Sequence, residues 1–228
     1  MNRKLIPPSH SPKGRTPNHD GAAGRERLLD AAVHLFSTHG IARTTIAQIA
    51  ATARVTSAMV HYWFSTREKL LDAVVKERLG PQIGAIWRPA DVERESAIAL
   101  VQGLLERMFQ VTAAAPWLPS LWLREIIQVG GLLQERVLKR IPQDLNLAFR
   151  TKIAQAQARG EINPQLDPNL LFVSMLALVM LPQAAATGWQ KVPGAQSSSR
   201  EQVQSHVHAL LTVGLSIPSS HRGEKADQ

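Results

Sequence analysis

Hydroxyl residues open two short helical patterns between residues 44 and 64, at a spacing suited to contact with a nucleic acid. Thr45 and Gln48 are three residues apart, so each side chain can bond the other's backbone N–H at a helix start. Val55 and Thr56 then make a turn, and Thr56 can cap the following helix. Two helices joined by so tight a turn must cross. Proteins use this arrangement to present one exposed helix to the DNA major groove.

Further helices should flank this pair. An apolar stripe at spacings of three and four precedes it and ends at Gly40, where a left-handed residue would close a helix. Ser65 or Thr66 can cap a helix after the pair, and Gly80-Pro81 should break that helix. The sequence therefore predicts a small helical bundle over residues 23–80.

The remainder of the chain is helix after helix, with almost no alternation of period two. The longest apolar run, Leu170 to Leu181, is too short to span a bilayer and ends at Pro182. Residues 170–186 are apolar nearly all round, which predicts a helix buried on most sides. A last apolar stripe lies within residues 203–215. The sequence predicts an all-α fold, with a three-helix N-terminal bundle containing a helix-turn-helix and a larger C-terminal helical bundle.

The positive charge of the chain is concentrated at its N-terminal end. The 228 residues include 26 Lys and Arg against 18 Asp and Glu, and residues 1–80 hold 12 of the basic and 6 of the acidic residues. A cationic first third suits a domain that meets a polyanion. The composition of residues 1–22 predicts a disordered basic arm. Residues 81–218 are expected to form the second bundle, and residues 219–228 are expected to be a disordered tail.

Several chemistries find no support in the sequence. The chain has no cysteine, which excludes disulfides and thiolate sites. Its carboxylates are scattered, and it has neither a Gly-rich phosphate loop nor a nucleophile elbow. We therefore expect no catalytic residue, no metal site and no cofactor. Leu5-Ile6 runs into Pro7-Pro8 without the apolar core of a signal peptide, so we expect a cytoplasmic protein.

One ordered series of motifs runs from residue 25 to residue 75. Its members are Leu35-Phe36, Gly40, Thr44-Thr45, Ile49-Ala50, Val55-Thr56, His61-Tyr62-Trp63-Phe64, Thr66-Arg67-Glu68 and Leu70-Leu71. Taken in order and at this spacing, the series resembles the TetR family of bacterial transcriptional regulators. Two positions depart from the family pattern: Ala58 stands where Gly is usual, and His61 where Tyr is common. The identity of the base and phosphate contacts therefore stays open.

The resemblance implies a set of residues that bind double-stranded DNA. In the family, the third helix lies in the major groove, which points to Thr56, Ser57, Ala58, Met59 and His61. Phosphate contacts are implied for Arg43, Thr44 and Thr45 at the second helix, and for Tyr62 and Arg67 on the far side. Val60 and Phe64 are expected to be core residues, whereas Tyr62 could equally face the core or the DNA.

The resemblance also implies a ligand pocket and a dimer interface in the second bundle. Helices 170–186 and 203–215 are the expected dimer helices. The expected pocket residues are Met108, Phe109, Trp117, Trp122, Phe149 and Met175. These side chains suit a small, mostly apolar effector, although at helical spacing they are also typical of plain core.

The function implied is that of a homodimeric, ligand-responsive repressor. It would bind an inverted-repeat operator and leave it when the effector binds. Two alternatives stay open: a DNA-binding protein without an effector, and a helical carrier of apolar small molecules whose basic end meets anionic lipid.

Overall fold

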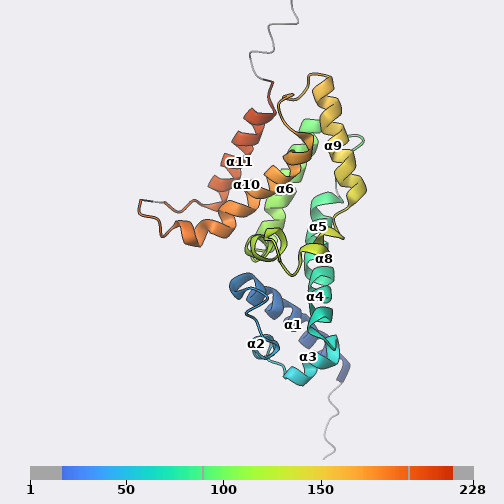
Figure 1. Ribbon diagram of the computed structural model, residues 1–228, viewed down its shortest axis with the longest axis vertical. Coiled ribbons are helices and arrows are strands. Elements are labelled where there is room, and N and C mark those ends of the chain that lie inside the picture. The colour runs from blue at the N-terminus through green and yellow to red at the C-terminus, as the bar shows by residue number, and fades with distance from the viewer. Residues whose placement is uncertain (1–16, 89, 195, 218–228) are drawn as a thin grey trace, which may run out of the picture.

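All regular elements in the part of the chain that the structure describes are helices. The computed structural model describes residues 17–88, 90–194 and 196–217. The elements are α1 (Pro17–His39), α2 (Ile46–Ala53), α3 (Ser57–Phe64), α4 (Arg67–Val74), the π-helical η1 (Val75–Leu79), α5 (Gly80–Trp87), α6 (Ala97–Ala114), α7 (Leu118–Trp122), the π-helical η2 (Leu123–Ile127), α8 (Gln134–Leu138), α9 (Gln143–Ala158), α10 (Pro168–Trp189) and α11 (Arg200–Leu215). The all-α fold expected from the sequence is confirmed (Figure 1).

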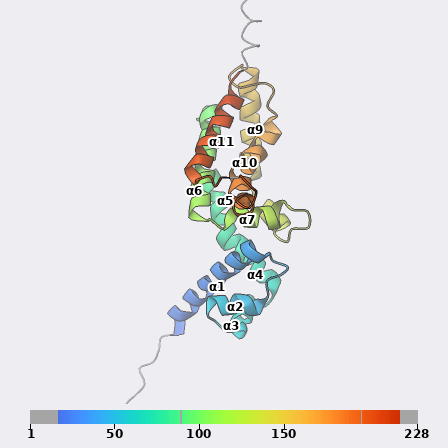
Figure 2. The ribbon, with the colours of Figure 1, turned by 90° about the vertical axis from the view of Figure 1, so that its left-hand side faces the viewer.

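Helices α1 to α4 form a small unit at one end of the molecule, away from α9, α10 and α11 (Figures 1 and 2). The apolar stripe of α1 supplies its core, in which Leu28, Leu29 and Phe36 are fully buried. Gly40 has a φ of 84° and ends α1, as the sequence predicts. Helix α1 begins at Pro17, so residues 17–22 are helical and were wrongly assigned to a disordered arm.

A continuous helical path leads from this unit into the rest of the molecule. The prediction that Gly80-Pro81 breaks the helix is wrong, because α4, η1 and α5 follow one another without an intervening loop. Proline lacks an N–H and its ring crowds the carbonyl four residues earlier. Here the wider π-helical turn of η1 comes directly before Gly80-Pro81, and the N–H of Gly80 donates to the carbonyl of Val75, five residues back. The boundary expected at residue 80 therefore lies within a helical rod.

Ion pairs hold α1 against η1. The guanidinium of Arg25 donates two hydrogen bonds to the carboxylate of Glu77, at 2.6 and 2.7 Å. These bonds hold the pKa of Glu77 below its ordinary value. Arg78 binds Asp30 at 2.7 Å and Glu26 at 2.8 Å. The start of the rod is thus fixed to the first helix.

The second part of the molecule is a bundle around α6 and α10 (Figures 1 and 2). An aromatic cluster ties α5 to α9 and α10: the rings of Trp87 and Phe172 lie 4.6 Å apart, and Phe149 meets both edge-on. Such offset and edge-to-face contacts are favourable beyond the apolar area that they bury. They fix the far end of the α4–α5 rod within this bundle.

Helix α10 differs from the sequence prediction in length and in burial. It continues through Pro182 to Trp189, and the side-chain amide of Gln183 donates to the carbonyl of Val179 beside the interruption. The window Pro168–Ala186 is long and apolar enough to cross a membrane by length and composition, so the apolar stretch is longer than the run Leu170 to Leu181 considered from the sequence. Only 28% of that window is buried, which also contradicts burial on most sides within a single chain.

Candidate nucleic-acid interface

Three hydroxyl side chains cap the N-termini of α2, α3 and α4 in the N-terminal unit. Thr45 accepts from the N–H of Gln48 at 3.2 Å, and its own N–H donates to the Gln48 side chain at 2.8 Å. This reciprocal capping is the one expected from the sequence. Thr56 caps α3 and Thr66 caps α4, through bonds of 3.3 and 3.2 Å from the N–H groups three residues on. The capped N-termini of α2, α3 and α4 carry the positive ends of helix dipoles, which favour anions.

The turn between α2 and α3 is closed by a non-glycine residue in the left-handed conformation. Arg54 has a φ of 57°, and its N–H bonds the carbonyls at the end of α2. The N–H of Val55 then reaches back to Ala50 at 3.0 Å. Helix α3 therefore begins two residues after this point and crosses α2, giving the helix-turn-helix predicted from the sequence.

Helix α3 has one buried and one exposed face. Val60 and Phe64 are buried, as expected. Tyr62 is 79% exposed, so its side chain lies on the outer surface of α3 and not in the core. The other exposed residues that the sequence placed on this surface are Arg43, Thr45, Thr56, Ser57, Ala58, Met59 and His61. Eight of the ten predicted DNA-binding residues thus have exposed side chains, counting Tyr62 with these seven.

The other two predicted contacts have partners within the protein. Thr44 is 1% exposed, and its hydroxyl donates to the carbonyl of Gly40 at 2.8 Å. Arg67 is only partly exposed, and its guanidinium donates to the carbonyl of Ile41. The burial of Thr44 contradicts its assignment as a phosphate contact. Arg67 stays a predicted contact, and its guanidinium also stabilises the turn between α1 and α2.

Contacts with α1 set the orientation of α3. A Cβ atom at Gly24 would lie 2.9 Å from the Trp63 ring, so only glycine allows α1 to approach this closely. The guanidinium of Arg25 lies over the ring of Phe64 at 5.1 Å. The buried side of the last turn of α3 is therefore packed directly against the first helix.

Two exposed cations near α3 were missed by the sequence analysis. Arg54 lies in the turn before α3, and Lys69 lies in the first turn of α4. Exposed Lys and Arg side chains supply many of the contacts to phosphate chains, so both are candidates for such contacts. The position of Arg54 inside the helix-turn-helix was a usable signal, but that turn was attributed to Val55 and Thr56 alone.

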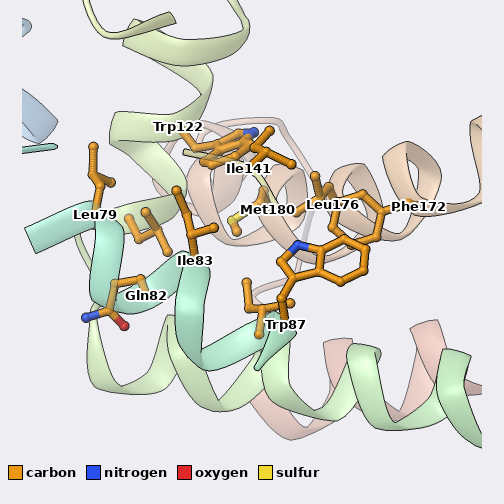
Figure 3. A pocket seen from close by; sticks show the side chains of 11 residues that line it. Leu79, Gln82, Ile83, Trp87, Trp122, Ile141, Phe172, Leu176 and Met180 are labelled. Atoms are coloured by element: carbon orange, nitrogen blue, oxygen red, sulfur yellow. The ribbon is translucent and has the colours of Figure 1, made fainter. Parts of the chain in front are cut away.

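The second bundle contains an apolar cavity of about 30 Å³. Its lining comes from η1, α5, α7, α10 and the segment after α8: Leu79, Gln82, Ile83, Ile86, Trp87, Leu118, Trp122, Ile141, Phe172, Leu176 and Met180 (Figure 3). One water needs roughly 10–15 Å³ of such volume, so the cavity has room for about two. A larger molecule can enter only if the lining helices move apart.

Only Trp122 among the six predicted pocket residues lines this cavity. Met108, Phe109, Phe149 and Met175 are buried elsewhere in the core, and Trp117 is partly exposed. Phe149 does not line the cavity itself, but it packs against two residues that do, Trp87 and Phe172. Apolar residues at helical spacing were thus mostly plain core. Among the described residues, no three His, Asp or Glu side chains gather as metal ligands.

Comparison with known proteins agrees with this geometry. The family model described as bacterial regulatory proteins, tetR family, matches residues 28–74, which include α2, α3 and α4. The N-terminal unit therefore matches the TetR family of bacterial transcriptional regulators. The chain is 23% identical over 194 residues to the biofilm operon icaADBC negative transcriptional regulator IcaR of Staphylococcus aureus (strain Newman), covering 84% of this chain and 98% of that protein.

Solved structures of the family extend the likeness to the second bundle. The ketosteroid transcriptional regulator KstR2 of Mycobacterium tuberculosis has a TM-score of 0.65 and 19% identity, over 84% of this chain and 94% of that one. FadR from Bacillus subtilis, solved in complex with stearoyl-CoA, has a TM-score of 0.61 and 18% identity, over 84% and 98% of the two chains. At these identities the likeness shows a shared fold. The family match over residues 28–74 and the likeness to curated regulators indicate a transcriptional regulator.

Proposed function

We propose that this regulator is a repressor that binds an inverted-repeat operator as a homodimer and is released by a small, mostly apolar effector. The observation that carries the proposal is the exposed face of α3, from Ser57 to Tyr62, flanked by capped helix N-termini. A face of this size fits the major groove, with short side chains at Ser57 and Ala58 allowing close approach of the backbone. Repression is supported by the likeness to IcaR, a negative regulator. Such a protein would act in the cytoplasm.

The dimer proposal rests on an apolar stripe along α10. Leu170, Val173 and Leu181 are all more than half exposed. At 100° per residue they fall within about 80° of the helix circumference, so they form one stripe. On α11, Leu210 and Val213 are also exposed, three residues apart and hence on one face. Contiguous apolar surface of this kind is characteristic of subunit interfaces.

A two-fold dimer determines the kind of DNA site. A second copy packed through α10 and α11 would place two α3 helices about a two-fold axis. Two identical half-sites, arranged as an inverted repeat and separated by one helical turn or a multiple of it, would then face the two copies of α3.

The small volume of the cavity supports release by an effector. An effector larger than two waters binds only a widened form, so its affinity differs between two states, as a population shift requires. Ile83, Ile86 and Trp87 of the cavity wall belong to α5, which continues through η1 into α4 of the DNA-binding unit. Widening the cavity would therefore move the rod that carries α4 and change the separation of the two α3 helices.

Titration of the purified protein against DNA tests the proposal. The probe is a labelled fragment from upstream of the protein's own coding sequence, with random fragments as competitor and light scattering to give the mass. We expect saturable binding of a dimer to one palindrome. Binding only to vesicles of acidic lipid would support the carrier function instead, and a monomer without a preference for any palindrome would refute the proposal.

Charged substitutions test the interface itself. Val213→Glu places a carboxylate on the exposed apolar face of α11, and we expect it to give monomers and to lower operator affinity at least tenfold. The matched control is Gln155→Glu on the exposed side of α9, which should leave the mass and affinity unchanged. A dimer that tolerates Val213→Glu would exclude this face.

A further inference from the structure

Glu125 is a buried acidic side chain, with 6% of its surface exposed. It belongs to η2 in the second bundle, yet its Oε1 accepts a hydrogen bond from the backbone N–H of Ile41 at 2.8 Å. Ile41 lies in the turn that joins α1 to α2. A charged acceptor in a water-poor site forms a strong hydrogen bond, and leaving that N–H unpaired would cost most of its hydration energy.

The turn is built to receive this carboxylate. Gly40 has a φ of 84°, and a Cβ atom there would lie 3.3 Å from Oε1 of Glu125 and 3.2 Å from Cδ of Arg124. Arg67 of α4 holds the carbonyl of Ile41, and Thr44 holds the carbonyl of Gly40. The turn is therefore fixed by α4 on one side and by η2 on the other. It leads directly into α2, against which the recognition helix α3 packs.

The same segment reaches the cavity. Trp122 lines the cavity at the end of α7 (Figure 3). Glu125 follows three residues later in η2. A π-helical turn holds one residue more per hydrogen-bonded ring than an α-helical turn. If η2 became α-helical, the residues after Trp122 would rotate by as much as about 100°, the rotation per helical residue. Residue 125 would then point away from Ile41.

We propose that Glu125 is a positioning residue that transmits the opening of the cavity to the α1–α2 turn, with η2 as the two-state element. The proposal rests on the function proposed above. Because the cavity has room for only about two waters, the bond between Glu125 and Ile41 belongs to the effector-free state, which under the proposed function binds the operator. Displacement of Trp122 by an effector converts η2, withdraws the carboxylate and frees the turn that leads into α2.

Hydrogen exchange measured residue by residue tests the contact first. In Glu125→Ala the amide of Ile41 should exchange about ten- to a hundredfold faster, as expected for loss of a charge-assisted bond. Glu125→Gln keeps an acceptor oxygen and should stay within about tenfold of the native rate. Glu135→Ala, at an exposed position of α8, is the control and should leave Ile41 unchanged. Native exchange in Glu125→Ala, or equal losses in the Ala and Gln variants, would overturn the hydrogen-bond assignment.

A second variant imitates the effector without requiring its identity. Met180 lines the cavity on α10, which packs against α7, and Met180→Trp adds more volume than the closed cavity can accept. We expect this wedge to lower operator affinity about tenfold and to speed exchange at Ile41, although it touches neither Ile41 nor DNA. If Glu125 only stabilised the turn and were not coupled to the cavity, Met180→Trp would leave exchange at Ile41 unchanged.

The double variant decides whether the two sites act through one element. Glu125→Ala should also lower operator affinity about tenfold. The double variant, which combines Glu125→Ala with Met180→Trp, should lose at most about threefold more affinity than the weaker-binding single variant. Fully multiplicative losses would overturn the coupling, as would native operator binding by Glu125→Ala. If the native protein binds no palindrome, the proposed function fails, while the exchange experiment still decides whether Glu125 holds the turn.

Discussion

Two glycines of α1 give a matched test of how the recognition helix is positioned. Gly21 and Gly24 are three residues apart on the same helix. A Cβ atom at Gly21 meets nothing within 4 Å, whereas a Cβ atom at Gly24 lies 2.9 Å from the ring of Trp63. Replacing either glycine by alanine favours the helix by up to about 1 kcal/mol. Only Gly24→Ala also pushes against Trp63, and overpacking of this kind costs about 1–3 kcal/mol.

The two substitutions should therefore change the free energy of unfolding by different amounts or in opposite directions. Gly21→Ala should raise the free energy of unfolding by up to about 1 kcal/mol. Gly24→Ala should change it by between zero and a loss of about 2 kcal/mol, once the overpacking is set against the helix gain. For a chain of this length, 1 kcal/mol corresponds to about 2–4 °C in Tm. Denaturant titration of both variants gives the comparison.

The functional consequence separates the two glycines further. Trp63 lies in the last turn of α3, so its displacement tilts the exposed face that carries Ser57 and His61. We expect Gly24→Ala to weaken operator binding about tenfold, comparable to the roughly 1–3 kcal/mol carried by one base contact. Gly21→Ala should bind as the native protein does. Equal stabilisation and native affinity in both variants would refute the packing of Trp63 against α1.

Three further outcomes follow from the DNA-binding unit. Arg54→Ala should weaken binding to operator and random DNA alike and reduce the slope of log affinity against log salt by about 1, measured by anisotropy at several salt concentrations; a loss confined to the operator would contradict a phosphate contact. Thr56→Ala should cost about 1 kcal/mol in unfolding free energy, with Thr56→Ser close to native, because the hydroxyl caps α3; equal values for both variants in denaturant titration would exclude the cap. Because Arg25 lowers the pKa of Glu77, their ion pair stabilises the fold at pH values above 4.5, the ordinary glutamate pKa, and this stabilisation is lost as the pH falls through the lowered pKa. Glu77→Gln should reduce this pH dependence of thermal unfolding, and an unchanged pH profile would contradict a stabilising ion pair.

Local rules predicted the N-terminal unit well. The capping pair Thr45 and Gln48, the cap at Thr56 and the terminator Gly40 all depend on backbone groups within four residues, so the sequence alone contains the partners. The buried face of α3 also followed from helical periodicity. These features were sufficient to place the exposed helix, which is the main part of the candidate site.

Features that depend on distant partners could not be predicted in this way. Thr44 and Arg67 have the residue types of phosphate contacts, but Gly40 and Ile41, brought near by the packing of α1, α2 and α4, supply carbonyls that bind them. The path through Gly80-Pro81 is helical because η1 widens the turn before it, and no local pattern marks a π-helical turn. The cavity lining likewise depends on which apolar faces meet across α5, α7 and α10.

The polar links between the two parts of the molecule differ in how strongly they resist salt. Arg136 of α8 pairs with Glu68 and Asp72 of α4, but both carboxylates are more than half exposed, and such pairs contribute about 0–1 kcal/mol and are screened. The bond between Glu125 and Ile41 is buried and is screened much less. Raising the salt concentration should therefore weaken operator binding at the exposed cations of the DNA face, while the link through η2 remains. Salt and an apolar effector would then release the DNA by separate routes, because salt acts on phosphate contacts and the effector acts on the contact that orients α2 and α3.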